Sequence, residues 1–171
     1  HDDVREGRRR PAGKLAGRAG ALYAAADKFE IVVPGKGGHA ARPHLTVDPV
    51  LVAAQIIVAV QSIVARSTDP MDAAVVSICK VEAGTAFNII ADEARMGGTV
   101  RTLSRASQDA TERRLGEIVT GVAASFGATA ELHYERGYPA LHNPADLYAR
   151  VRQIAIGVVG ADRFVDLEGP G

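Results

Sequence analysis

Tryptophan is absent from the 171 residues, cysteine occurs once, and aromatic residues make up only 5% of the chain. The lone Cys79 excludes an internal disulfide and is compatible with a reducing compartment, so we expect a cytoplasmic protein. The 20 lysines and arginines balance the 20 aspartates and glutamates, which leaves a formal net charge of zero. This balance gives no general reason to expect nucleic acid or an anionic membrane as a partner.

Long hydrophobic runs are also missing. The longest apolar stretch, residues 47–60, is interrupted by Asp48, Pro49 and Gln55, and we expect it to be too short to span a bilayer. The content of 47% hydrophobic and 23% charged residues is ordinary for a globular domain. Because the chain starts at His1 without an initiator methionine, we expect it to be a piece of a longer protein.

Charge is distributed unevenly along the chain. Residues 1–20 hold six basic and three acidic side chains, a net charge of +3, so the remainder carries −3. The run Arg8-Arg9-Arg10 is able to contact phosphate groups. The alternative is a solvated chain terminus without a ligand.

Hydrophobic periodicity predicts an α+β fold. Asp48-Pro49 is typical of a helix start, and Ser107 is a second candidate cap, for a helix that ends before Gly127. The order strand, helix, strand, strand, helix, strand indicates a ferredoxin-like βαββαβ unit, in which a four-stranded antiparallel sheet carries two helices on one face. The expected strands are residues 29–33, 73–81, 93–103 and 128–134, and the expected helices are residues 49–65, 107–126 and, as a flanking element, 145–159.

This pattern divides the chain into three parts. Residues 29–136 form the expected α+β domain, and residues 1–28 and 137–171 are its flanks. The flanks lie outside the closed βαββαβ unit, so we expect them to need a partner domain.

The most informative stretch is Gly-Lys-Gly-Gly-His-Ala-Ala-Arg-Pro-His at residues 35–44. It lacks the Lys-Ser/Thr of a phosphate-binding loop. Its glycines are expected to let the backbone turn sharply and to leave His39 exposed. An exposed imidazole can donate a hydrogen bond to a developing oxyanion or transfer a proton, but a loop histidine without a task is an equally good interpretation.

Residues 35–44, with Thr-Val-Asp-Pro at 46–49, resemble the di-metal amidohydrolases of the aminoacylase, hippurate hydrolase and auxin-conjugate hydrolase type in peptidase family M20. Three further motifs agree in order: Thr-Asp-Pro at 68–70, Gly-Thr-Ala-Phe-Asn-Ile-Ile at 84–90 leading to Gly-Gly-Thr-Val-Arg-Thr at 97–102, and Gly-Tyr-Pro-Ala-Leu-His-Asn at 137–143.

The resemblance implies a lid or dimerisation domain with short flanks from a catalytic domain. It implies a parent enzyme that hydrolyses the amide bond of N-acyl amino acids with a pair of divalent metal ions, zinc or manganese. The metal ligands would lie mostly outside this chain, so we expect no metal site here and no activity from the isolated chain. We expect a homodimer, formed through the helix at 49–65, with Ile56 on the pairing face, and an exposed sheet edge.

Three side chains match the family's functional positions. The resemblance implies that His39 reaches across the dimer and stabilises the transition state, that Asn88 orients substrate, and that Arg101 binds the substrate carboxylate. Each has a structural alternative: His39 without a task, Asn88 capping a turn, and Arg101 pairing with Glu93 or Glu131.

Two departures from the family pattern stand out. Ala91 replaces a common proline, so we expect a looser turn there. His1 is the only histidine upstream of Pro11 and is either a displaced metal ligand or the edge of a fragment. We also expect Cys79 to lie in the core. The alternative function is a stand-alone ferredoxin-like dimerisation or ligand-binding module without catalysis.

Overall fold

The computed structural model describes residues 12–170, so His1 and the Arg8-Arg9-Arg10 run lie outside the described residues. The chain divides into a central unit, Ala24–Ala140, and a flanking unit built from the two ends up to Tyr23 and from Leu141. The central unit is wider than the expected 29–136 because its first strand begins at Ala26 and its last strand runs to Tyr138.

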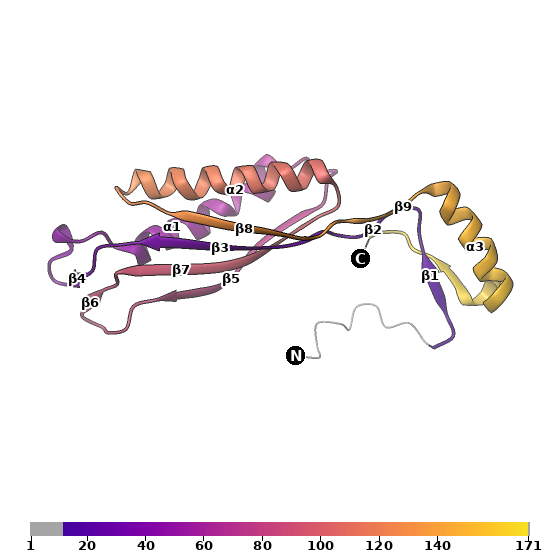
Figure 1. Cartoon of the computed structure of the whole chain (residues 1–171), viewed down its shortest axis with the longest axis horizontal. Coiled ribbons are helices and arrows are strands. Elements are labelled where there is room, and N and C mark those ends of the chain that lie inside the picture. Colours follow the sequence, from indigo (N-terminus) through magenta and orange to yellow (C-terminus); the bar gives the residue numbers. More distant parts are fainter. Residues whose placement is uncertain (1–11, 171) are drawn as a thin grey trace. The chain divides into compact units, whose positions relative to one another are not determined.

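The central unit contains one long sheet (Figure 1). Four strands follow the order β5-β7-β3-β8, and every neighbouring pair is antiparallel. Helix α1 connects β3 to β5, and helix α2 connects β7 to β8. The α+β class with four antiparallel strands is therefore confirmed. The elements are β3 Ala26–Pro34, β4 Gly38–His39, α1 Pro49–Val60, β5 Ala74–Ala83, β6 Ile89–Ile90, β7 Glu93–Thr102, α2 Arg105–Ser125 and β8 Glu131–Tyr138.

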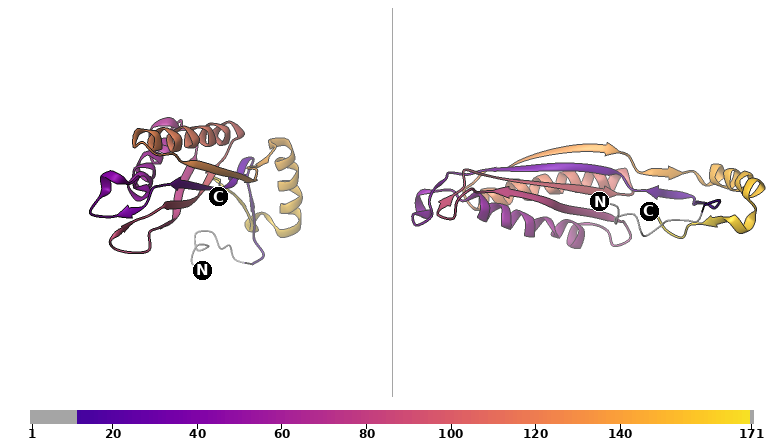
Figure 2. Two further views of the ribbon diagram at one scale, coloured as in Figure 1. Left: turned by 60° about the vertical axis from the view of Figure 1, so that its left-hand side comes forward. Right: turned by 90° about the horizontal axis from the view of Figure 1, so that it is seen from below.

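Both helices contact each other and pack on the sheet, and Figure 2 shows them from two further sides. Strand β3 alternates buried and exposed residues, which directs one row of side chains towards the helices. These meet apolar side chains of α1, α2 and β7 in a single core. Its fully enclosed members include Ile31, Val33, Val52, Ile56, Val60, Ile63, Met96, Val100, Leu115 and Val119.

The start of α2 differs from the expected one. Ser104 is the N-cap, and its Oγ accepts a hydrogen bond of 3.1 Å from the backbone N–H of Ser107. Ser107 is therefore the residue that is capped, and it lies buried inside the helix. Serine occurs at both positions, so the sequence alone does not decide which of two helix starts, three residues apart, is used.

Helix α1 begins as expected. Oδ1 of Asp48 accepts hydrogen bonds from the backbone N–H groups of Val50 (2.9 Å) and Leu51 (3.3 Å). The helical stretch continues as a π-helical turn, Ile63–Ser67, so Pro49–Ser67 spans 19 residues with a mean hydropathy of 1.8. By length and composition alone it could cross a membrane, which corrects the expectation that the apolar run is too short. Core helices of soluble proteins pass the same test, and one face of α1 packs against the sheet.

The environments predicted for two residues, Ile56 and Cys79, are wrong. Ile56 is fully buried against the sheet, so it does not lie on an outer pairing face. Cys79 is exposed instead of lying in the core. The register of β5 against β7 shifts between Ile78 and Lys80, which leaves Cys79 unpaired at an irregularity. Period-two alternation is interrupted there, and no local sequence pattern predicts this irregularity.

The flanking unit joins distant parts of the chain. Strands β1 (Leu15–Gly17) and β10 (Phe164–Asp166) pair in parallel, and β2 (Gly20–Tyr23) pairs antiparallel with β9 (Leu141–Asn143). Helix α3 spans Ala145–Val159, as expected. Its apolar stripe is exposed throughout: Leu147, Val151, Ile154 and Val158.

Candidate functional site

Strands β4 and β6 form a small separate pair at the left-hand end of the long sheet in Figure 1. His39 pairs with Ile89, and Gly38 pairs with Ile90. The backbone N–H of Ala40 donates a hydrogen bond of 3.0 Å to the carbonyl oxygen of Asn88. We call this region, residues 35–48 with residues 84–92, the tip. It brings two of the three candidate residues together from segments about fifty positions apart in the chain.

The glycines of the tip serve close packing. Gly37 donates its backbone N–H to Oδ1 of Asp92 at 3.0 Å, and a Cβ on Gly37 would lie 2.5 Å from that same oxygen. A Cβ on Gly35 would lie 2.7 Å from the carbonyl oxygen of Val47. Neither glycine has a positive φ angle. These two positions therefore require glycine for space, and the expectation that His39 is exposed is confirmed.

The imidazole of His39 is exposed and locally oriented. The backbone N–H of Ala41 donates to its Nδ1 at 3.1 Å. An Nδ1 that accepts a hydrogen bond leaves the neutral ring with its proton on Nε2. Among the described residues Nε2 has no partner, so His39 presents a free hydrogen-bond donor to whatever approaches the tip.

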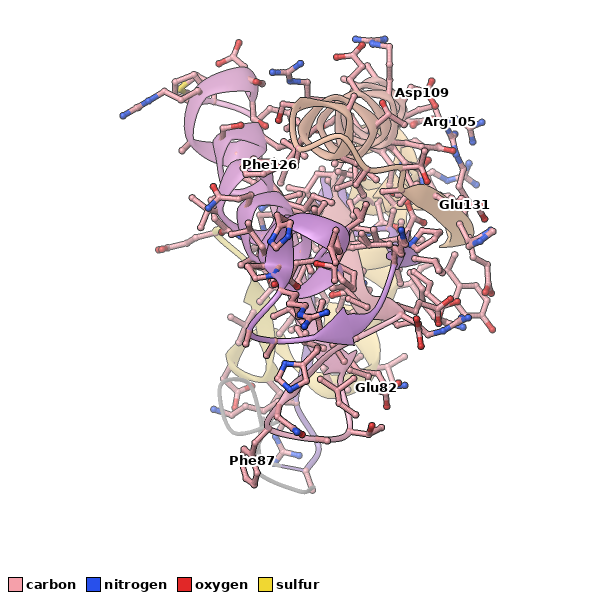
Figure 3. The ribbon with its side chains drawn as sticks, turned by 90° about the vertical axis from the view of Figure 1, so that its left-hand side faces the viewer. Glu82, Phe87, Arg105, Asp109, Phe126 and Glu131 are labelled. Atoms are coloured by element: carbon pink, nitrogen blue, oxygen red, sulfur yellow. The ribbon has the colours of Figure 1, made fainter. Side chains whose placement is uncertain are left out.

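Asn88 is exposed beside it, and its side-chain amide makes no hydrogen bond within the part of the chain that the structure describes. The structural alternative, in which the side chain of Asn88 caps a turn, is therefore wrong. The neighbouring Phe87 projects fully into solvent from the same loop (Figure 3).

Arg101 lies near the opposite end of β7, at the end that we call the base: residues 24–28, 99–102 and 134–140. Its Nη1 donates to the carbonyl oxygens of Val100 (2.9 Å) and Asp27 (3.3 Å). The alternative partners are engaged elsewhere, since Glu93 pairs with Arg95 at 2.6 Å and Glu131 pairs with His133 at 3.6 Å. The structural alternative, in which Arg101 pairs with Glu93 or Glu131, is therefore wrong.

The base and the tip are far apart within one chain. Strand β3 ends at Pro34, opposite Glu93, where the tip begins. The eight steps from Glu93 to Arg101 along β7, at about 3.3 Å each, amount to roughly 26 Å. The structure thus brings His39 and Asn88 together and keeps Arg101 away from both.

The part of the chain that the structure describes holds no cluster of metal ligands. Among residues 12–170, no group of three or more His, Cys, Asp or Glu side chains could hold a metal ion. A half-open cavity of about 220 Å³ lies between the end of α1 and the start of α2. Its lining includes none of the three candidate residues. The donor set of the described chain therefore does not fit a di-metal centre.

Two aspartates that the motifs did not single out organise these regions. Asp92 holds the glycine loop at the tip. Asp27 is completely buried at the base, where its carboxylate accepts three hydrogen bonds. For Asp27 a signal existed, because it is the one charged residue at an inward position of the alternating β3 strand.

The central unit is thus an α+β domain with an exposed histidine at its tip and, at its base, an arginine that forms no ion pair among the described residues. Residues 25–126 match the family model described as the peptidase dimerisation domain. The match covers more than half of the chain, which therefore belongs to the M20 peptidase dimerisation domain family.

Relatives with this domain are hydrolases. The chain is 39% identical over 160 residues to IAA-amino acid hydrolase ILR1-like 2 of Arabidopsis thaliana, covering 91% of this chain and 36% of that protein. It is 42% identical over 133 residues to N-acetylcysteine deacetylase of Bacillus subtilis, covering 78% of this chain and 35% of that protein. The chain thus spans little more than a third of the length of these relatives.

Solved structures share the fold. A protein from methicillin-resistant Staphylococcus aureus superposes with a TM-score of 0.82 at 29% identity, over 93% of this chain and 41% of the other. The YXEP protein of Bacillus subtilis, described as a dinuclear metal-binding peptidase of the M20 family, superposes with a TM-score of 0.70 at 31% identity. That alignment covers 94% of this chain and 39% of that one.

Proposed function

We propose that this chain is the lid and dimerisation region of a metal-dependent amidohydrolase that cleaves N-acyl amino acids. The observation that supports this proposal best is that His39, with its free Nε2–H donor, and Asn88 lie together at an exposed tip. The relatives support the substrate class, because their names specify amino-acid conjugates and N-acetyl amino acids. The connectivity β3-α1-β5-β7-α2-β8 supports assignment to the ferredoxin-like fold.

The distance between tip and base favours action across a dimer. A single N-acyl amino acid is shorter than the roughly 26 Å that separate Arg101 from the tip. One substrate therefore cannot contact His39 and Arg101 of the same chain. In a symmetric pair, the tip of one protomer can meet the base of the other, which would complete a site with His39, Asn88 and Arg101.

The pairing surface that we propose is the outer face of α1 with the edge strand β5. Val50, Leu51 and Val58 on α1 are exposed, and so are Val75 and Val81 on β5. Strand β5 ends the sheet, so one side of its backbone is available for a further strand. This apolar face has the character of an interface between copies.

The remaining chemistry belongs to the longer enzyme. We propose that a pair of divalent ions, zinc or manganese, supplies the Lewis acid there, held by ligands outside this chain. The exposed apolar stripe of α3 supports a catalytic domain that covers the flanking unit. Within this chain, His39 would donate from Nε2 to the developing oxyanion, and Arg101 would hold the carboxylate. We further propose cytoplasmic localisation and no nucleic-acid or membrane partner.

Mixed dimers test this function. A subunit with His39→Ala, combined with a subunit whose metal site is disabled, forms one hybrid site with intact metals and an intact partner histidine. We expect activity on N-acetyl or N-benzoyl amino acids to return in verified mixed dimers. No recovery would show that His39 does not act across the dimer. The isolated 171-residue chain with zinc, manganese or cobalt is expected to be inactive, and chelator-sensitive turnover by it would contradict the proposal.

A further inference from the structure

The carboxylate of Asp27 is buried, and no cationic side chain among the described residues pairs with it. The side chain is 0% exposed and faces the helix side of β3. Within residues 12–170, no ion pair reaches it. A buried charge in this position is costly unless hydrogen bonds replace water. Three donors do so: Nε2 of Gln108 (2.7 Å), the hydroxyl of Tyr134 (2.7 Å) and the backbone N–H of Gly137 (3.0 Å).

These donors come from two different elements and are themselves constrained. Gln108 belongs to α2, and the other two belong to β8. Burial, together with the hydrogen bond to Asp27, raises the pKa of Tyr134 above its ordinary value, so its hydroxyl stays protonated and continues to donate. At Gly137 the β3–β8 register shifts, and a Cβ there would lie 2.1 Å from the carbonyl oxygen of Ala26. The start of β3 is thereby fixed in position.

The same residue supports Arg101 through its backbone. The carbonyl oxygen of Asp27 accepts from Nη1 of Arg101, as does that of Val100. Nη1 is thus engaged with two backbone carbonyl oxygens. Nε and Nη2 have no partner among the described residues. This pair forms the side of a guanidinium that binds a carboxylate with two parallel hydrogen bonds.

We infer that Asp27 is a positioning residue for Arg101. Its buried carboxylate fixes the peptide whose carbonyl oxygen anchors Nη1, and this anchor orients the free Nε and Nη2 edge towards the substrate carboxylate. The inference rests on the proposed function, since it takes Arg101 to be the carboxylate-binding residue. Asp27 itself faces the opposite side of the sheet from Arg101 and does not touch substrate.

The test measures carboxylate recognition in the longer enzyme. The two substrates are an N-acetyl amino acid and the same compound with its carboxylate capped as an amide, and the readout is the acid-to-amide ratio of kcat/KM. We expect Asp27→Asn to lower this ratio by about tenfold through KM, the scale of one charge-assisted hydrogen bond, with kcat nearly unchanged. The double variant Asp27→Asn with Arg101→Ala should have the same ratio as Arg101→Ala alone.

Tyr134→Phe and Thr111→Val complete the design. Tyr134→Phe removes one donor and keeps the carboxylate, so the ratio should fall by a smaller factor. Thr111→Val alters another buried polar side chain of α2 that has no bond to Asp27, and it should leave the ratio unchanged.

The outcomes separate the two proposals. An unchanged ratio in Arg101→Ala would contradict the role of Arg101 in the proposed function. A collapsed ratio in Arg101→Ala with an unchanged ratio in Asp27→Asn would overturn only the role of Asp27. If Asp27→Asn does not fold, Tyr134→Phe decides: an unchanged ratio there, or an equal loss in Thr111→Val, overturns the inference.

Discussion

The tip and the base of the same four-stranded sheet are built by opposite means. At the tip, backbone hydrogen bonds and close glycine contacts hold the two loops together, and the side chains of His39 and Asn88 remain exposed. At the base, a buried carboxylate organises side-chain and backbone donors, and Arg101 is anchored through one nitrogen. A tip built in this way suits contact with another protomer, whereas the base suits a fixed carboxylate clamp.

The largest effect is expected at the tip. Replacing His39 with alanine in the longer enzyme removes the Nε2–H donor, and kcat should fall by roughly a hundredfold or more with little change in KM. Steady-state kinetics with an N-acyl amino acid measures both constants. The matched control is His44→Ala, an exposed histidine of the same tip that takes no part in the pairing of β4 with β6. A comparable loss of kcat in both variants would show that the effect is not specific to His39.

A second test alters the tip backbone without touching a candidate side chain. In Gly37→Ala the new Cβ would lie 2.5 Å from Oδ1 of Asp92 and 2.8 Å from the carbonyl oxygen of Ile90, so the loop must shift. Because a small displacement of a catalytic group lowers the reaction rate strongly, we expect kcat to fall by about tenfold. The thermal midpoint of the central unit should change little, since its core lies elsewhere. Gly121→Ala on α2, where a Cβ meets nothing within 4 Å, is the control.

The pairing surface that would bring tip and base together gives a third test. Val58→Lys places a charge on the outer face of α1, where this side chain is 69% exposed in the single chain. We expect the dimer dissociation constant to rise by about tenfold, equivalent to ~1.4 kcal/mol. Sedimentation over a concentration series measures it. Gln61→Lys, also exposed and near the end of the same helix, checks whether added charge alone accounts for the change.

The smallest effect concerns acid stability at the base. The hydrogen bond from Arg136 is the main reason that the pKa of Asp109 is lowered from 3.8. A carboxyl whose pKa is lower in the folded state than in the unfolded state stabilises the folded state at every pH above the unfolded-state pKa. This contribution is lost as the pH falls through the folded-state pKa. Melting curves should therefore show a small extra loss of stability below about pH 3.8 that Asp109→Asn abolishes. Equal pH profiles for both proteins would contradict it.

Local sequence signals predicted much of the scaffold. Asp48-Pro49 marked the start of α1, and the apolar stripe of residues 145–159 matched α3. The long strands were recognisable because their inward positions must be apolar to bury one face of a sheet. Errors occurred where regular alternation breaks, as at Cys79, or where two serines compete for one cap, as at Ser104 and Ser107.

The candidate site was only partly accessible to sequence reasoning. The motif containing His39 identified its family, and the roles assigned to Asn88 and Arg101 depend on that resemblance. Asp92 could not be found in this way, because its function is to accept a bond from Gly37, 55 positions away. This contact joins two loops that lie far apart in the sequence, so only the folded chain shows it.

By itself, the sequence determined the α+β class, the starts of α1 and α3 and the family, because these depend on short-range periodicity, capping chemistry and ordered motifs. Only the tertiary structure decided that His39 and Asn88 share the tip, that Arg101 lies roughly 26 Å away along β7, and that Asp27 is sealed in the base. The physical reason is that antiparallel pairing converts positions distant in sequence into neighbours. It also separates the two ends of a strand by its full extended length.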